Sequence, residues 1–265
     1  MTNNRSIISW NVNGIRAAQK KGLIEWLTSE SPDFLCLQET KAEPGQLDEQ
    51  LMDIEGYAPF FMSAEKKGYS GVSIYSKETP LQVSPLGYPE FDSEGRTLML
   101  DFDDFSLISA YFPNSQYGGA RLSYKLDYCE AMFGFCKDLA AKRRNFVLCG
   151  DFNIAHKPID LARPKANEQT PGYLPEERAW MDMFINNGFV DTFRIFNKEP
   201  NNYTWWSYRM QAREKNIGWR LDYHCVPEYF QDSIISSKIL KDVLGSDHCP
   251  IRLTLRGANF DENTL

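Results

Sequence analysis

The chain has 265 residues, of which 42% are hydrophobic and 25% are charged. These proportions are close to the globular average, which excludes disordered, collagen-like and coiled-coil classes. Apolar runs such as Phe34–Leu37 and Phe146–Cys149 have the length of a strand and fall far short of the roughly 18 residues of a membrane span. Residues 1–9 hold no apolar signal segment, so we expect a protein of the cytoplasm with no membrane partner.

The charge balance is acidic, with a formal net charge of −7 at pH 7. Such a chain does not bind polyanions over its whole surface, although a local basic face remains compatible with this charge. The six cysteines are scattered, without the paired spacing of a zinc site. Because we expect a cytoplasmic protein, we also expect these thiols to be reduced.

Short apolar segments recur along the chain, many of them ending in a polar cluster, and they predict strands. In chain order the predicted strands are Ser6–Trp10, Asp33–Leu37, Gly71–Tyr75, Thr97–Phe102, Ser106–Phe112, Asn145–Cys149, Arg220–Val226 and Pro250–Leu255. The pair Asp103-Asp104 separates two of these strands and favours a hairpin there.

Helices fit between the strands. Arg121–Arg143 spaces its apolar residues three or four apart, which predicts a long helix, and Gly22–Ser29 and Glu176–Asn186 predict shorter ones. The alternation indicates an α/β protein, and the hairpin requires mixed rather than purely parallel sheets. No linker or repeat divides the chain. We therefore expect a single domain over residues 1–257, followed by a polar tail at residues 258–265.

Polar residues that can carry chemistry gather where predicted strands end or begin. They are Asn11, Glu39, Asp151, Asn153, Asp222, Asp247 and His248. Each one alone has an ordinary interpretation as a turn, a helix cap or a surface pair. Together they supply oxygen ligands of the kind that Mg²⁺ or Mn²⁺ prefers, and a histidine that an aspartate can orient. No glycine-rich phosphate loop and no GxSxG motif is present, which leaves metal-assisted hydrolysis, most naturally of a phosphoester.

Six motifs in order carry a resemblance to a known family. They are Trp10–Arg16, Leu37–Lys41, Ala110–Asn114, Gly150–His156, Trp219–Tyr223 and Ser246–Pro250. The chain resembles the exonuclease III and apurinic-apyrimidinic (AP) endonuclease family, within the endonuclease/exonuclease/phosphatase superfamily. The resemblance spans nearly the whole chain. It implies a four-layered α/β sandwich, in which two mixed sheets pack face to face between helices, with the active site at one edge.

The same resemblance implies roles for the polar residues. The metal ligands would be Asn11, Glu39, Asp151, Asn153, Asp247 and His248, holding Mg²⁺ or Mn²⁺. Asp151 would take the proton of the attacking water, and Asn153 would orient that water. His248, supported by Asp222, would donate to the phosphate, and Tyr111 would contact it. Asn13 stands where some relatives have Asp, which alters the surroundings of the site without removing a ligand.

Substrate binding is implied for Asn114, Trp205, Arg209, Trp219 and Leu221. The two tryptophans and Leu221 would form an apolar pocket for a base-less sugar flipped out of the duplex. The alternative interpretation is that Trp205, Trp206 and Trp219 are ordinary core aromatics. Arg209 would enter a groove beside the flipped site.

Basic residues near the motifs can supply a local face that contacts phosphates. The candidates are Arg16, Lys20, Lys21, Lys41, Lys66, Lys67, Arg209, Arg213, Lys215 and Arg220. Some of these charges are expected to be merely solvated.

These expectations combine into a Mg²⁺-dependent DNA repair phosphodiesterase that cuts duplex DNA 5′ to abasic sites and leaves a 3′-hydroxyl, with 3′→5′ exonuclease activity. We expect a monomer in the cytoplasm, associated with the nucleoid if the source is prokaryotic. The alternative enzyme is a superfamily phosphatase acting on a small phosphoester, against which the arginine- and tryptophan-rich segment 205–220 speaks. A catalytically dead DNA-binding module is a third possibility, but a dense carboxylate cluster would repel phosphate without a metal.

Overall fold

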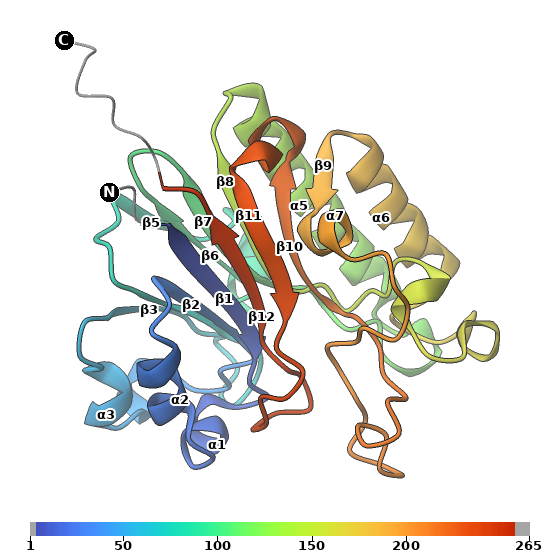
Figure 1. The fold of residues 1–265 in the computed structure, drawn as a ribbon, viewed down its shortest axis with the longest axis horizontal. Helices are drawn as coiled ribbons and strands as arrows, with labels where there is room; N and C mark the ends of the chain where they lie inside the picture. The colour runs from blue at the N-terminus through green and yellow to red at the C-terminus, as the bar shows by residue number, and fades with distance from the viewer. Residues whose placement is uncertain (1–3, 258–265) are drawn as a thin grey trace.

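Two six-stranded sheets stack face to face in the computed structural model, which describes residues 4–257 (Figure 1). The first sheet has the order β11 (Ile234–Ile239), β12 (Ile251–Leu255), β1 (Arg5–Asn11), β2 (Phe34–Gln38), β4 (Val72–Ser76) and β3 (Ala58–Met62). The second has the order β5 (Gln82–Ser84), β6 (Thr97–Asp101), β7 (Ser106–Tyr111), β8 (Phe146–Asp151), β10 (Asp222–Pro227) and β9 (Phe189–Asp191).

Each sheet has one parallel pair at its centre, β1 with β2 and β7 with β8, while the other pairs are antiparallel. A parallel pair needs a long crossover, usually helical. Helices α1 (Ile15–Gln19) and α2 (Leu23–Glu30) lie in the first crossover, and α5 (Leu122–Ala141) lies in the second. The remaining helices are α3 (Glu49–Met52), α4 (Pro89–Asp92), α6 (Pro175–Asn186) and α7 (Thr192–Phe196).

Three apolar clusters fill the spaces between four layers. Alternate residues of β1 point to opposite faces, so that Ile7 packs between the sheets while Ile8 packs with Leu23 and Leu27 of α2. On the far side, α5 and α6 cover the second sheet (Figure 1), where Met132 and Phe184 pack against Leu148. The expected sandwich of two mixed sheets between helices is confirmed.

All eight strands and all three helices predicted from the sequence are present, with small shifts at their ends. One shift matters for the site. The strand expected from Arg220 begins at Asp222, because the backbone N–H groups of Leu221 and Asp222 donate to the Thr204 hydroxyl instead of a neighbouring strand.

The strands that sequence patterns did not predict are β3, β5, β9 and β11, all at or beside sheet edges. Strands β5 and β9 have only three residues each, too few to show a period. The predicted tail, residues 258–265, lies outside the described residues. Within residues 4–257, no helix is both long and apolar enough to cross a membrane.

His224 on β10 is an unusual component of this interior. Both ring nitrogens are buried and have no hydrogen-bond partner among residues 4–257, and a cavity of about 10 Å³ lies beside the ring. Burial lowers the pKa of His224 to about 3, because the charged imidazole would lose its hydration. An unfolded chain binds that proton near pH 6.5. The stability that depends on neutral His224 is therefore complete above pH 6.5 and is lost as the pH falls towards 3.

Replacing His224 with leucine should remove this dependence. Between those two pKa values, His224 costs the wild-type protein about 1.4 kcal/mol of unfolding free energy for each pH unit. The difference in unfolding free energy between His224→Leu and wild type should therefore shift in favour of the variant as the pH falls. Urea unfolding at about pH 7, 6 and 5 measures it. A difference that stays constant across this range would contradict the assignment.

Candidate active site

A cleft of about 270 Å³ opens at the edge where strand ends from both sheets converge. Its lining combines the ends of β7 and β8, the residue after β2, and the loops that precede β10 and β12. The lining residues are Glu39, Tyr111, Asn114, Asp151, Asn153, Thr170, Pro171, Gly172, Trp205, Trp219, Leu221, Asp247 and His248. Segments distant in the sequence therefore meet in one cavity.

Three of the predicted site residues do not line the cleft. Asn11 and Asp222 are buried directly behind it and hydrogen-bond to residues that do line it. Arg209 is exposed and lies outside the lining.

Asn11 holds two carboxylates of the cleft together. Its side-chain nitrogen lies 2.8 Å from Glu39 Oε1 and 2.9 Å from Asp151 Oδ2, and donates to both. Its side-chain oxygen accepts from the backbone N–H of Asn13 at 3.0 Å. Both the nitrogen and the oxygen of the Asn11 side-chain amide are therefore hydrogen-bonded to protein groups. These hydrogen bonds fix the positions of Glu39 and Asp151, and the expected role of Asn11 as a metal ligand stays a prediction.

A buried histidine–aspartate pair forms the floor of the cleft. His248 Nδ1 lies 2.9 Å from Asp222 Oδ2, and His248 Nε2 lies 3.8 Å from Asp151 Oδ2. Burial alone would lower the pKa of His248, but the charges of Asp222 and Asp151 raise it to about 10. The imidazole is therefore a cationic donor at neutral pH.

Asp151 is the last residue of β8 and is almost fully buried. Burial, together with the nearby charges of Asp222 and Glu39, raises the pKa of Asp151 to about 7, against the opposing charge of His248. A carboxylate whose pKa lies near neutrality is suited to accept a proton during a reaction. Perturbation of this kind in a cleft is typical of a functional site.

The outer acids, Glu39 and Asp247, are ionised more readily. Burial would raise the pKa of both carboxyls. The charge of Lys41, 2.7 Å away, lowers the pKa of Glu39. The charge of His248 and the hydrogen bond from the Trp205 indole N–H lower the pKa of Asp247. Asn13 also donates its side-chain amide to Asp247 at 3.1 Å. An aspartate at position 13 would lack that donor and would add a negative charge.

The polar side of the cleft is completed by two asparagines and a tyrosine. The Asn153 amide donates to the Phe112 carbonyl at 3.0 Å, and its oxygen accepts from Asn114 at 3.1 Å. Burial, followed by the charges of Glu39 and Asp151, raises the pKa of Tyr111 well above its usual range, so its hydroxyl stays protonated.

The opposite wall is apolar. Trp205 and Trp219 meet edge to face, with ring centroids 6.4 Å apart, and Leu221 lies beside them. Both rings are only half-buried and line the cleft, whereas Trp206 is 4% exposed and packs in a separate cluster. The interpretation as core aromatics therefore holds for Trp206 and is wrong for the other two.

Comparison with known proteins agrees with this geometry. Residues 8–248 match the Endonuclease/Exonuclease/phosphatase family. The chain belongs to this family. It is 43% identical to the exodeoxyribonuclease of Bacillus subtilis over 94% of this chain and 98% of that protein. It is 42% identical to the DNA repair nuclease APEX1 of Danio rerio over 95% of this chain and 82% of that protein. The crystal structure of the AP endonuclease LMAP from Leishmania major superposes with a TM-score of 0.85 at 29% identity, covering 96% of this chain and 88% of that one.

As in a metal-dependent nuclease of this family, the donor set fits a divalent cation. Ligand atoms of Asp151, Asp222 and His248 lie within 4.8 Å of one another. Asp222 and His248 are hydrogen-bonded to each other, and Glu39 and Asp247 add two further carboxylates to the lining that Asp151 shares. Three carboxylates concentrate negative charge there, and a hard cation would relieve it.

Sequence reasoning missed one part of the wall, the turn Thr170–Gly172. Gly172 has a φ of +93°, and a Cβ there would lie 3.3 Å from the Asn153 carbonyl oxygen and 3.4 Å from the Trp219 ring. A threonine–proline–glycine sequence indicates a turn and nothing more. Only the fold shows that this turn closes the cleft.

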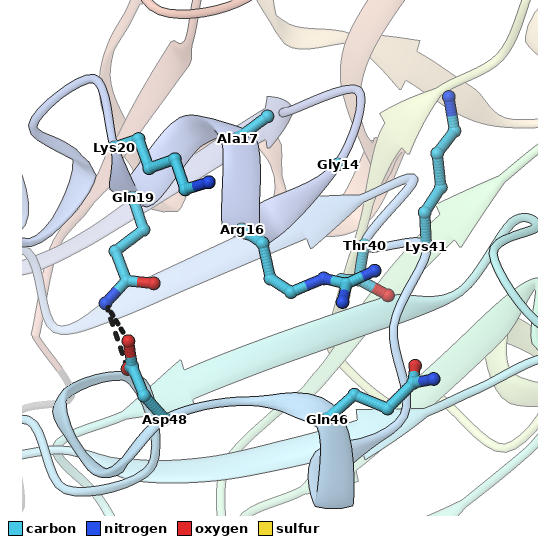
Figure 2. A pocket seen from close by; sticks show the side chains of 9 residues that line it. All are labelled: Gly14, Arg16, Ala17, Gln19, Lys20, Thr40, Lys41, Gln46 and Asp48. Atoms are coloured by element: carbon cyan, nitrogen blue, oxygen red, sulfur yellow. Dashed lines mark hydrogen bonds between the residues drawn. The ribbon is translucent and has the colours of Figure 1, made fainter.

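A second cleft, of about 490 Å³, lies beside the first and is lined by Arg16, Lys20 and Lys41 (Figure 2). We call it the basic cleft. Arg16 and Lys20 are exposed and have no acidic partner within the part of the chain that the structure describes. The acid on its rim, Asp48, is engaged by Gln19.

Two arginines expected on the phosphate-contacting face are committed elsewhere. Arg220 is 1% exposed and pairs with Asp160 at 2.7 Å and Asp191 at 2.6 Å. Arg213 donates to the carbonyls of Lys241 and Val243. The expectation is therefore wrong for Arg220, which is an internal ion-pair partner, and Arg213 ties two loops together.

Proposed function

We propose that this protein is a DNA repair phosphodiesterase that uses Mg²⁺ to cut duplex DNA on the 5′ side of abasic sites, leaving a 3′-hydroxyl, with accompanying 3′→5′ exonuclease activity. The observation that carries the proposal is the pairing of two unlike walls in one cleft. Carboxylates and a cationic histidine face an apolar wall of Trp205, Trp219 and Leu221. This combination suits a phosphate joined to a sugar that has lost its base.

The chemistry assigned to the polar wall follows from protonation states. Asp151 accepts the proton of the attacking water, and Asn153 orients that water. Cationic His248, held by Asp222, donates to a phosphate oxygen and stabilises the charge that grows on it. Tyr111 donates its hydroxyl to the same phosphate. Bound Mg²⁺ or Mn²⁺, with Glu39, Asp151 and Asp247 as its ligands, would supply Lewis-acid polarisation of the phosphate.

The apolar wall supplies selectivity. An intact nucleotide flipped from the duplex carries a planar base, and we propose that the close wall of Trp205, Trp219 and Leu221 admits a bare sugar in preference to it. A bare deoxyribose has an apolar face that fits against Trp219 and Leu221. Asn114 would contact the phosphate, and exposed Arg209 would enter a groove of the duplex.

The names of two relatives support this proposal. The Bacillus subtilis protein is an exodeoxyribonuclease, and the Dictyostelium discoideum protein, 39% identical, is a DNA-(apurinic or apyrimidinic site) endonuclease. We further propose a single catalytic domain over residues 1–257, acting as a monomer in the cytoplasm or on a prokaryotic nucleoid. The alternative function is a phosphatase of small phosphoesters. A small substrate would not extend into the neighbouring basic cleft, whereas duplex DNA would.

Trp219→Ala tests the apolar wall. Removing the indole takes away the surface against which the bare sugar packs, so kcat/KM at a tetrahydrofuran abasic analogue should fall by about tenfold or more. Digestion of an intact recessed 3′ end and overall duplex affinity should change much less. Gel assays of the two labelled duplexes give both rates.

Phe196→Ala provides the matched control, because Phe196 is a half-exposed aromatic on α7 outside the cleft. That variant should leave the ratio of the two rates unchanged. Equal losses on both substrates in Trp219→Ala would refute the role of the apolar wall in selecting abasic sites.

The basic cleft predicts a salt effect. If Arg16 and Lys20 each neutralise one DNA phosphate, Arg16→Ala and Lys20→Ala should each flatten the slope of log affinity against log salt by about 0.9. Fluorescence anisotropy with duplex DNA at several salt concentrations measures this slope. Lys142→Ala, an exposed lysine at the end of α5, should leave it unchanged. Unaltered slopes in the first two variants would remove this cleft from the DNA interface.

A further inference from the structure

Three loops around the active-site cleft are tied together by one ion pair that lies outside it. Lys125 of α5 and Glu177 of α6 meet with Nζ 2.7 Å from Oε1, and both side chains are 0% exposed. Neither residue lines the cleft, and neither has a role in the chemistry proposed above. The other hydrogen bonds of the two side chains all go to segments that form the walls of the cleft.

Lys125 reaches the polar wall. Its Nζ donates to the backbone carbonyl of Asn153 at 2.6 Å. Asn153 has a φ of +51°, in the left-handed region, which asparagine adopts more readily than most non-glycine residues but still at some cost. The lysine therefore helps to hold a strained backbone position, and with it the Asn153 side chain that contacts Asn114 and Asp151.

Glu177 reaches both walls. Its Oε1 also accepts from the hydroxyl of Ser115, the neighbour of Asn114, at 2.6 Å. Its Oε2 accepts from the backbone N–H groups of Gly172 at 2.7 Å and Leu174 at 2.9 Å. A Cβ at Gly172 would lie 3.4 Å from the Trp219 ring, so this turn lies against the apolar wall. One carboxylate thus connects the phosphate side of the cleft to its apolar side.

Stability alone does not account for such a pair. A buried ion pair gains little over well-packed apolar residues of similar volume, because both charges lose their hydration. Here each charge makes several hydrogen bonds, in directions that fix where three separate loops lie. An arrangement of this kind specifies geometry.

We propose that Lys125 and Glu177 form a positioning pair that sets the separation between the polar and apolar walls, and thereby both the rate and the preference for an abasic sugar. The inference rests on the proposed function, which it deepens by naming residues that determine specificity. The pair acts through Asn153, Ser115 and Gly172 and does not touch the substrate.

The test compares Lys125→Met with the double variant Lys125→Met/Glu177→Gln. The single variant leaves a buried charge without its partner and should lower Tm strongly. The double variant removes that charge, so its Tm should recover much of the loss. The tie to the Asn153 carbonyl stays absent, so kcat at the abasic analogue should remain lower by about tenfold or more. Its ratio to 3′-end digestion should also fall.

A purely structural role predicts the opposite. If kcat and the ratio of the two rates return to wild-type values as Tm recovers in the double variant, the proposal is overturned. Arg5→Met/Glu78→Gln is the matched control, because this ion pair (2.7 Å) lies at the end of β1 opposite Asn11. It should leave both the rate and the ratio unchanged.

A milder variant covers the case in which the double variant does not fold. Ser115→Ala removes one hydrogen bond of Glu177 and leaves the ion pair intact. Its kcat at the abasic analogue should fall several-fold with little change in Tm. Wild-type kcat in this variant, as in a folded double variant, would overturn the proposal.

A readout that does not depend on catalysis separates this inference from the proposed function. In NMR spectra, the indole N–H of Trp219 and the side-chain amide of Asn153 should both shift in the double variant, or in Ser115→Ala if the double variant does not fold. If wild type cuts no abasic duplex, the proposed function fails, and these shifts alone decide whether the pair positions the two walls. Unchanged resonances would then refute the positioning role of Lys125 and Glu177.

Discussion

Carboxylates contributed by both sheets are held in one buried cleft, and their mutual repulsion is the constraint on which the rest of the site depends. Asp151, Asp222 and His248 bring their ligand atoms within 4.8 Å of one another, and Glu39 is joined to Asp151 through the amide of Asn11. Like charges in a poorly hydrated space disfavour ionisation, which is why the pKa of Asp151 rises to about 7.

Positive charges at two places in the cleft offset this repulsion. At its floor, His248 is a cation between Asp222 and Asp151, with its pKa raised to about 10. At the mouth, Lys41 keeps Glu39 ionised. A divalent cation in the cleft would complete the compensation. The raised pKa of Asp151, the raised pKa of His248 and the negative charge that would attract a cation therefore share one cause, the crowding of carboxylates.

The topology explains why this convergence is possible. Each sheet has a central parallel pair, so β1 and β2 direct their carboxyl ends to the same edge, as β7 and β8 do in the second sheet. Stacking the sheets brings those two edges together. Long helical crossovers return the chain behind each sheet and leave the edge free for loops, which then supply the apolar wall.

Much of this could be predicted from the sequence, for a physical reason. Buried strands are apolar runs, and a polar residue directly after such a run has to lie at an edge, so Glu39 and Asp151 were identifiable as site residues. The long helix α5 was recognisable from its spacing of apolar residues. Family resemblance added the pocket tryptophans, which half-burial then distinguished from core Trp206.

What the sequence could not reveal depends on contacts between distant segments. The sequence does not distinguish Arg220 from Arg16. In the structure, Arg220 is buried and paired with Asp160 and Asp191, whereas Arg16 is exposed. The orientation of the Asn11 amide depends on which groups the fold places around it. For the same reason, the link between Lys125 and Glu177, 52 positions apart, carries no local pattern.

The central claim is that both walls of the cleft act on one substrate, and the most direct test is cleavage of two labelled duplexes. One holds a central tetrahydrofuran abasic analogue, and the other is intact with a recessed 3′ end. Both are incubated with Mg²⁺ and with EDTA, with Asp151→Asn as the catalytic blank. The account predicts a single Mg²⁺-dependent cut 5′ to the analogue. A ladder from the 3′ end without any internal cut would contradict it.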